Sequence, residues 1–247
     1  MRVRVVRART PAVGETGEEG HVLDSIFAAD SALMRVLGRF ADVVVLNLLF
    51  VATSLPLVTL GGSLTALHRT AIQIVRGRCE SVTEEYLRAF RANLRQGSVL
   101  LAVLLGLAGV LAAWYVVVTV VVAEPAAQLV LLAVWFVLAL TLTTTALLAF
   151  PYLATFDDPT RRVLRNARLM SWRHPLTTVA ILLLVTLPVV VTVFYPQLVG
   201  YGLLWLAFGF GAVACLTAIL VTRIFDRYIP SAPAERRSEN GTARAHP

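Results

Sequence analysis

Long blocks without a charged side chain separate the basic residues of this chain. All 22 basic residues are arginines, and most of them gather in a few hydrophilic patches. A helix needs about 20 apolar residues to cross a hydrocarbon core about 30 Å thick, so each block is long enough for one crossing or two. The blocks without arginine, aspartate or glutamate are residues 43–68, 97–123, 126–156 and 174–222. This pattern predicts an all-α, polytopic helical membrane protein.

The composition agrees with a lipid environment. Hydrophobic residues make up 57% of the 247 positions and the mean hydropathy is +0.75, whereas soluble domains are about 45–50% apolar. The net charge of +7 would suit nucleic acid if the arginines lay on one folded face. Because they alternate with apolar blocks, we expect membrane lipids to be the acidic partner and expect no nucleic acid.

The distribution of arginine predicts the orientation in the membrane. The two loops around Glu124 and Pro196 contain no arginine, whereas the other connections do. Cytoplasmic loops are enriched in basic residues, so both termini should lie inside a multi-pass plasma-membrane protein. Residues 1–29 and 230–247 are predicted to be mobile cytoplasmic tails that flank a transmembrane domain over residues 30–229.

The first apolar block leaves two topologies open. Residues 40–76 contain Pro56 followed by Gly61 and Gly62, so a break or sharp turn is expected there. Either the segment crosses the membrane twice, which gives six spans in total, or it forms a re-entrant hairpin beside four spans.

Two cytoplasmic amphipathic helices are predicted between the spans. The first covers Ser81–Arg95, where Ser81 and Glu84 form a capping-box pattern. The second begins after Asp157 and Asp158, with Pro159 in its first turn. Their arginines are candidate contacts for lipid headgroups or for a docking partner: Arg88, Arg91, Arg95, Arg161, Arg165 and Arg168.

The sequence contains no recognisable catalytic motif. It has no zinc-protease, nucleophile-elbow, phosphate-loop or dinucleotide-binding pattern, and acidic residues are almost absent from the predicted spans. Cys79 and Cys215 suggest neither a disulfide nor a zinc site. We therefore expect a protein that is not an enzyme and that uses no cofactor or metal.

A polar strip in the first hairpin is the candidate ligand site. Beside a broken helix, ionisable and hydroxyl groups within a membrane segment suit a polyhydroxylated or anionic ligand. This interpretation makes the chain a small-solute carrier or channel; in the competing interpretation Arg69, about 10 Å from Arg76, only reaches the headgroups. The candidate residues are Asn47, Thr53, Ser54, His68 and Arg69.

Several stretches resemble the YesL-like family of bacterial integral membrane proteins. The similar stretches are residues 33–42 (LMRVLGRFAD), 47–50 (NLLF), 53–61 (TSLPLVTLG), 86–93 (YLRAFRAN) and 150–156 (FPYLATF). The family is defined as a domain of unknown function, and its members are often encoded beside carbohydrate ABC transporters. The resemblance implies an accessory role in carbohydrate uptake, with ABC transporter subunits as partners and no established site residues. Arg69 departs from the family pattern, which has an aromatic or apolar residue there.

Overall fold

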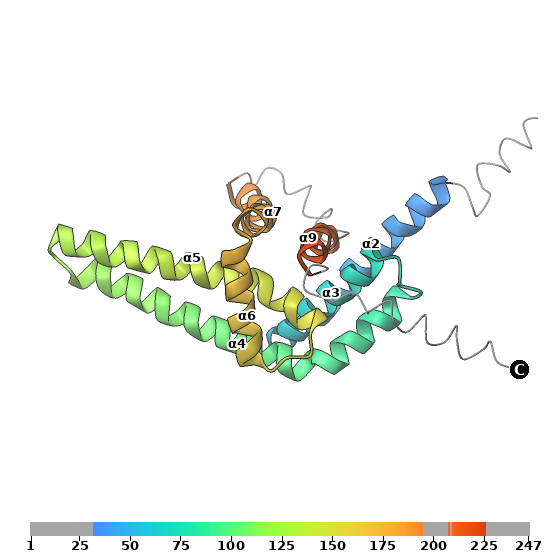
Figure 1. Cartoon of the computed structure of the whole chain (residues 1–247), viewed down its shortest axis with the longest axis horizontal. Coiled ribbons are helices and arrows are strands. Elements are labelled where there is room, and N and C mark those ends of the chain that lie inside the picture. Colours follow the sequence, from blue (N-terminus) through green and yellow to red (C-terminus); the bar gives the residue numbers. More distant parts are fainter. Residues whose placement is uncertain (1–31, 195–206, 208, 226–247) are drawn as a thin grey trace, which may run out of the picture. The chain divides into compact units, whose positions relative to one another are not determined.

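The computed structural model describes residues 32–194, 207 and 209–225 (Figure 1). Within these residues every secondary-structure element is a helix, which confirms the predicted all-α class. The two predicted tails and the predicted loop around Pro196 lie outside the described residues. The elements are α2 (Ala32–Ser54), the 3-10 helix η1 (Leu57–Thr59), α3 (Leu60–Val75), α4 (Val82–Val121), α5 (Pro125–Thr155), α6 (Thr160–Arg173), α7 (Pro175–Phe194) and α9 (Phe210–Phe225).

The chain divides into two compact units, residues 1–41 and 42–247. The described part of the first unit is the beginning of α2. The second unit holds the remainder of α2 and all later helices, and the packing and contacts below belong to it.

The predicted break in the first apolar block is confirmed at Pro56. This residue is extended, with φ −77° and ψ 116°, and a residue before proline avoids the helical region, so α2 ends at Ser54. Gly61 and Gly62, expected in the turn, instead lie inside α3. They let α3 approach α4 closely, because a Cβ atom on Gly97 of α4 would lie 2.6 Å from the carbonyl oxygen of Gly61.

The predicted first surface helix is not a separate element. Residues 82–95 form the beginning of α4, which continues without interruption through the apolar block to Val121. The side chain of Ser81 caps it by accepting from the Glu84 amide at 3.4 Å, as the capping pattern predicted. Helical hydrogen bonding can continue across a change of polarity when no proline intervenes. The 40 residues extend about 60 Å, and in Figure 1 the helix changes direction between its teal and green parts.

The apolar part of α4 forms a helical hairpin with α5 (Figure 1). The indole N–H of Trp135 in α5 donates to the carbonyl oxygen of Leu111 in α4 at 2.7 Å. Much of the hairpin's apolar surface stays outside any core: Val120 is 77% and Leu129 is 71% exposed. A surface of this kind is suited to lipid rather than to water.

Two prolines lie inside helices. Pro151 lies in the third apolar block, residues 126–156, where a proline predicts an interruption, but α5 continues through it to Thr155. Because Pro151 stands in the last turns of α5, its missing N–H removes only one hydrogen bond near the helix end. Pro188 lies inside α7.

Two apolar clusters hold the second unit together, and α4 and α9 contribute to both. The first also draws on α2 and α3; its buried members are Leu46, Phe50, Ala66, Leu67, Ala71, Ile72, Val82, Tyr86, Ala89, Ala214 and Ala218. The second joins α4 to the end of α5, α6, α7 and α9; it includes Leu100, Leu148, Leu153, Val163, Ala167, Ile181, Val221 and Phe225.

Three described helices are long and apolar enough to cross a membrane. They are residues Val36–Ser54 of α2, α4 and α5; a fourth span results if α6 and the first part of α7, which meet at 105°, count as one broken span. Two of the six predicted spans correspond to α3 and to the region of α9. Of these, α3 has 16 residues, whereas the residues before α9 are only partly described. A 16-residue helix extends only about 24 Å, less than a core of about 30 Å. The arrangement of six spans, or of four plus a re-entrant hairpin, therefore stays a prediction.

Candidate functional site

Asn47 connects two helices rather than facing a cavity. Its side chain is fully buried, and its Oδ1 accepts from the backbone N–H of Gly211 at 2.9 Å. Gly211 lies near the beginning of α9, so Asn47 binds the helix backbone there. A Cβ atom on Gly211 would lie 2.7 Å from the carbonyl oxygen of Val43. The contact between α2 and α9 therefore depends on this pair.

Thr53 and Ser54 also make structural contacts. The Thr53 hydroxyl lies 2.5 Å from the phenol oxygen of the buried Tyr86, and it donates to the carbonyl of Leu49 at 2.9 Å. Ser54 donates to the carbonyl of Val51 in its own helix. Thr53 thus links the end of α2 to α4, whereas Ser54 bonds only within α2.

Arg69 has an acidic partner that the sequence did not suggest. Its Nε lies 3.3 Å from Oε1 of Glu85, whose other oxygen lies 3.4 Å from Arg88. The preceding residue, His68, has a buried Nδ1 without a hydrogen-bond partner among the described residues. Asn47, Thr53 and Arg69 are therefore engaged by other residues of the chain, and none of the five candidates of the polar strip lines the cavity beside α6 that is described below.

The arginines of α4 are exposed. Arg88, Arg91 and Arg95 follow one another at intervals of three and four residues, so they share one side of the helix. The opposite side packs inward through Tyr86, Ala89 and Asn93. Their role as contacts for headgroups or for a docking partner stays a prediction.

Asp158 fixes the connection between α5 and α6. Its Oδ1 accepts from Arg162 at 2.8 Å, and its Oδ2 accepts from the phenol of Tyr152 at 2.8 Å. Its backbone carbonyl accepts from the Gln96 side chain of α4 at 2.6 Å. The bond from Arg162, then that from Tyr152, holds the pKa of this carboxyl below its usual value. The helix itself begins after Pro159 without a side-chain cap, so Asp158 positions its start through these contacts and does not cap it.

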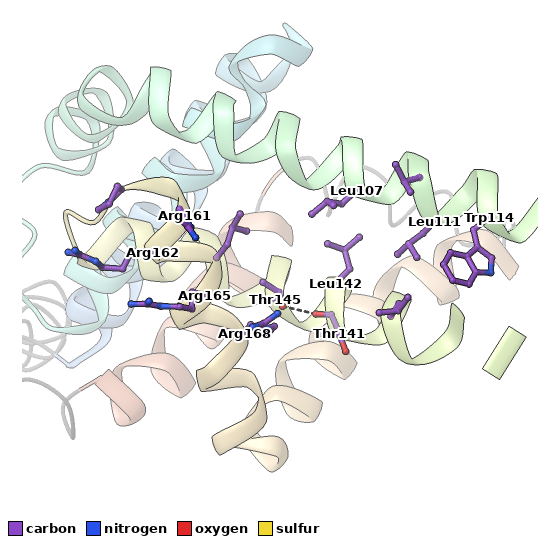
Figure 2. Close-up of a pocket in the computed structure, with 14 residues that line it drawn as sticks. Leu107, Leu111, Trp114, Thr141, Leu142, Thr145, Arg161, Arg162, Arg165 and Arg168 are labelled. Carbon is purple, nitrogen blue, oxygen red and sulfur yellow. Dashed lines mark hydrogen bonds between the residues drawn. The ribbon is translucent and has the colours of Figure 1, made fainter. Parts of the chain in front are cut away.

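The arginines of α6 lie at a cavity. With the connection fixed by Asp158, α6 turns Val163, Ala167 and Met170 inward and lies against α4 and α5. The cavity between the three helices has a volume of about 910 Å³. Figure 2 shows the arginines gathered on one side and leucines of the two long helices on the other. Its lining residues include Leu107, Leu111, Trp114, Leu138, Leu142, Arg161, Arg162, Arg165 and Arg168.

Sequence reasoning found the charged half of this cavity and missed the rest. Arg161, Arg165 and Arg168 were predicted as headgroup or docking contacts, and the structure brings all three to the cavity. The apolar wall was missed because nothing in the blocks 97–123 and 126–156 distinguishes one leucine from another. The roles of Glu85 and Asp158 were missed as well, although Glu85 stands three residues before Arg88 and Asp158 four before Arg162, spacings that commonly form helix ion pairs.

The described residues offer few groups for metal or thiol chemistry. They contain no cluster of three or more His, Cys, Asp or Glu side chains that could hold a metal ion. Cys79 and Cys215 are free thiols in the described part of the chain. Burial, with Asp42 and Glu85 nearby, raises the pKa of Cys79, which disfavours a reactive thiolate.

The helices and their exposed apolar surfaces define a helical membrane protein with an arginine-lined cavity beside one helical hairpin. A family model described as "Protein of unknown function, DUF624" matches residues 43–119, which is less than half of the chain. The match includes most of α2, all of α3 and nearly all of α4; α6 and its arginines lie outside it. No curated protein and no solved structure matches the chain.

Proposed function

We propose that this chain is a YesL-like integral membrane protein without enzymatic activity that assists carbohydrate uptake by docking to subunits of an ABC transporter. The family match over residues 43–119 supports the relationship. The transporter partner rests on the resemblance, whose members are often encoded beside carbohydrate transporters. Docking requires a surface that is open to the cytoplasm and continuous with a membrane anchor.

One observation supports the assignment of the docking surface to α4. The exposed arginines Arg88, Arg91 and Arg95 share one side of α4, and the same helix continues into the apolar hairpin with α5. The charged part of α4 is thus joined to the apolar part by continuous helix. A cationic helix surface of this kind fits an acidic surface on a partner subunit. The α6 arginines are less suitable for docking because they lie at the cavity.

The proposed location is the plasma membrane, with both termini in the cytoplasm. The arginine-free connection at Glu124 then faces outward, and the connections that carry Arg78 and Arg161 face inward. This orientation places the α4 arginines where an ATPase or the inner face of a permease can reach them.

The carrier or channel interpretation gains less support. It needs a continuous polar cavity at Asn47, Thr53, Ser54, His68 and Arg69. Asn47 is hydrogen-bonded to the backbone of α9, and Thr53 is hydrogen-bonded to Tyr86. Arg69 lies beside Glu85, which compensates its charge without a ligand.

Quantitative co-purification tests the docking proposal. The full chain, carrying an affinity tag, would be cross-linked in native membranes, purified and analysed for ABC transporter ATPase and permease subunits. We expect these subunits to be enriched with the wild-type chain and to fall at least fivefold when Arg88, Arg91 and Arg95 are all replaced by glutamate. Charge reversal should act strongly because it turns attraction into repulsion.

A charge-matched variant supplies the control. Replacing Arg161, Arg165 and Arg168 by glutamate changes the net charge equally but leaves the α4 surface intact, so the transporter subunits should still be recovered. Their absence from the wild-type sample, or an equal loss in both triple variants, would contradict docking through α4.

A further inference from the structure

The cavity between α4, α5 and α6 combines two opposite chemistries. One side carries arginine side chains from α6. The hairpin side carries mostly leucine, valine and tryptophan side chains, together with the hydroxyl groups of Thr141 and Thr145 (Figure 2). Of its described lining residues, four are arginines and none is acidic. A ligand that satisfies both sides must carry an anionic group at one end and an apolar body at the other.

Within the described residues, one of the four arginines at the cavity forms an ion pair. Arg162 forms an ion pair with Asp158 at 2.8 Å. Arg161, Arg165 and Arg168 form no ion pair with any described residue. Guanidinium groups bind phosphate through two parallel hydrogen bonds, so neighbouring arginines on one helix favour a phosphate group over a neutral headgroup.

The apolar side has the dimensions and the exposure that an acyl chain requires. Trp114 follows Leu107 by seven positions in α4, a distance of about 10 Å along the helix axis. Leu138 and Leu142 of α5 face the same space. Leu107 and Leu138 are 47% and 42% exposed. The cavity is therefore open toward the exterior of the hairpin, where hydrocarbon rather than water is expected.

We propose that this cavity is a binding site for one acidic phospholipid of the inner leaflet. The phosphate lies among Arg161, Arg165 and Arg168, and an acyl chain lies along Leu107, Leu111 and Leu142. A free phosphate ion would leave the apolar wall uncovered, and a zwitterionic lipid would leave the arginines only partly compensated. The proposal is independent of the docking surface on α4, since it uses different side chains and a different ligand.

Tryptophan fluorescence tests the site, because Trp114 lies in the cavity wall. The full chain, purified in a non-ionic detergent, would be titrated with phosphatidylglycerol that carries bromine atoms on its acyl chains, and separately with equally brominated phosphatidylcholine. Bromine quenches tryptophan only at close range. We expect phosphatidylglycerol to quench at a concentration about tenfold lower than phosphatidylcholine, and Trp114→Phe to remove most of that signal.

Matched variants separate the site from general attraction to a basic protein. Arg165→Ala with Arg168→Ala should abolish the preference for phosphatidylglycerol, whereas Arg88→Ala with Arg91→Ala removes the same charge elsewhere and should retain it. All four positions are exposed, so folding should survive, and an unchanged melting temperature would verify this.

Three results would overturn the proposal. Equal quenching by the two lipids would show that the arginines do not select a headgroup. An equal loss of preference in both double variants would show that net charge alone attracts the lipid. Complete displacement of the lipid by excess inorganic phosphate would show a phosphate site that does not need the apolar wall.

Discussion

Asp158 joins three helices through one side chain and one carbonyl group. It accepts hydrogen bonds from Arg162, Tyr152 and Gln96, and Tyr152 in turn accepts from Asn166 at 2.7 Å. These contacts determine where α6 begins and hence where its arginines lie. The carboxylate form is the one that accepts both side-chain bonds, which is why its pKa is depressed.

The depressed pKa of Asp158 predicts a pH dependence of stability. A carboxyl whose folded pKa is lowered below 3.8 contributes stability above its unfolded pKa and loses it as the pH falls through the folded value. The melting temperature of Asp158→Asn in non-ionic detergent should therefore lie below that of the wild type at pH 7. The difference should shrink below about pH 4. Asp157→Asn, one residue earlier, serves as the control; a similar pH dependence in that variant would contradict the assignment.

The pair Thr53 and Tyr86 predicts a measurable coupling between α2 and α4. Tyr86 is fully buried, so removing its partner hydroxyl leaves its phenol less satisfied. Thr53→Val should lower the free energy of unfolding by about 1–2 kcal/mol. Denaturant unfolding of Thr53→Val, Tyr86→Phe and the double variant measures the coupling, and additive effects would show that the two hydroxyls do not interact.

At the scale of the elements, glycines set the distance between α3 and α4. Because the two backbones touch at Gly61 and Gly97, neither position has room for a Cβ atom. The other glycines of α4 differ: a Cβ atom on Gly106 or Gly109 would meet nothing within 4 Å. Among the glycines of α4, Gly97 alone therefore packs closely against another described helix.

This difference yields a matched pair of substitutions on one helix. Gly97→Ala should push α3 away from α4 and destabilise the protein by about 1–3 kcal/mol. Gly106→Ala should be neutral or stabilising by up to about 1 kcal/mol, because alanine favours the helix more than glycine does. Thermal unfolding in detergent measures both, and an equal response would show that the close approach has no energetic consequence.

The sequence predicted the helical class, the break at Pro56 and the arginine surfaces, because each follows from local composition. It did not predict that α4 would continue from Val82 to Val121, since a change from charged to apolar residues was interpreted as a boundary between helices. The sequence also did not predict which residues contact Asn47 and Arg69. Gly211 is 164 positions from Asn47, and no local pattern indicates which distant backbone amide a buried side chain will reach.

At the scale of the whole second unit, α4 contacts both the turn between α2 and α3 and the connection between α5 and α6. The Ser98 hydroxyl donates to the carbonyl of Val58, in the turn between α2 and α3, at 2.6 Å. Two residues earlier, Gln96 donates to the carbonyl of Asp158. Two residues of helix correspond to about 3 Å. The α2–α3 turn therefore lies at nearly the same level of α4 as the start of α6.

This shared level predicts the side of the membrane on which the turn lies. Val58 is 79% exposed, as an accessible reporter must be. In a background with Cys79→Ser and Cys215→Ser, single cysteines would replace Val58, Glu124 or Asp157 and be treated with a membrane-impermeant maleimide. Right-side-out vesicles should label the cysteine at position 124 only, and inside-out vesicles those at positions 58 and 157. Because the N-terminus is proposed to be cytoplasmic, this result requires that residues 40–76 do not cross the bilayer. If residues 40–76 cross the bilayer twice, position 58 will instead be labelled with position 124, because the turn then reaches the outer surface.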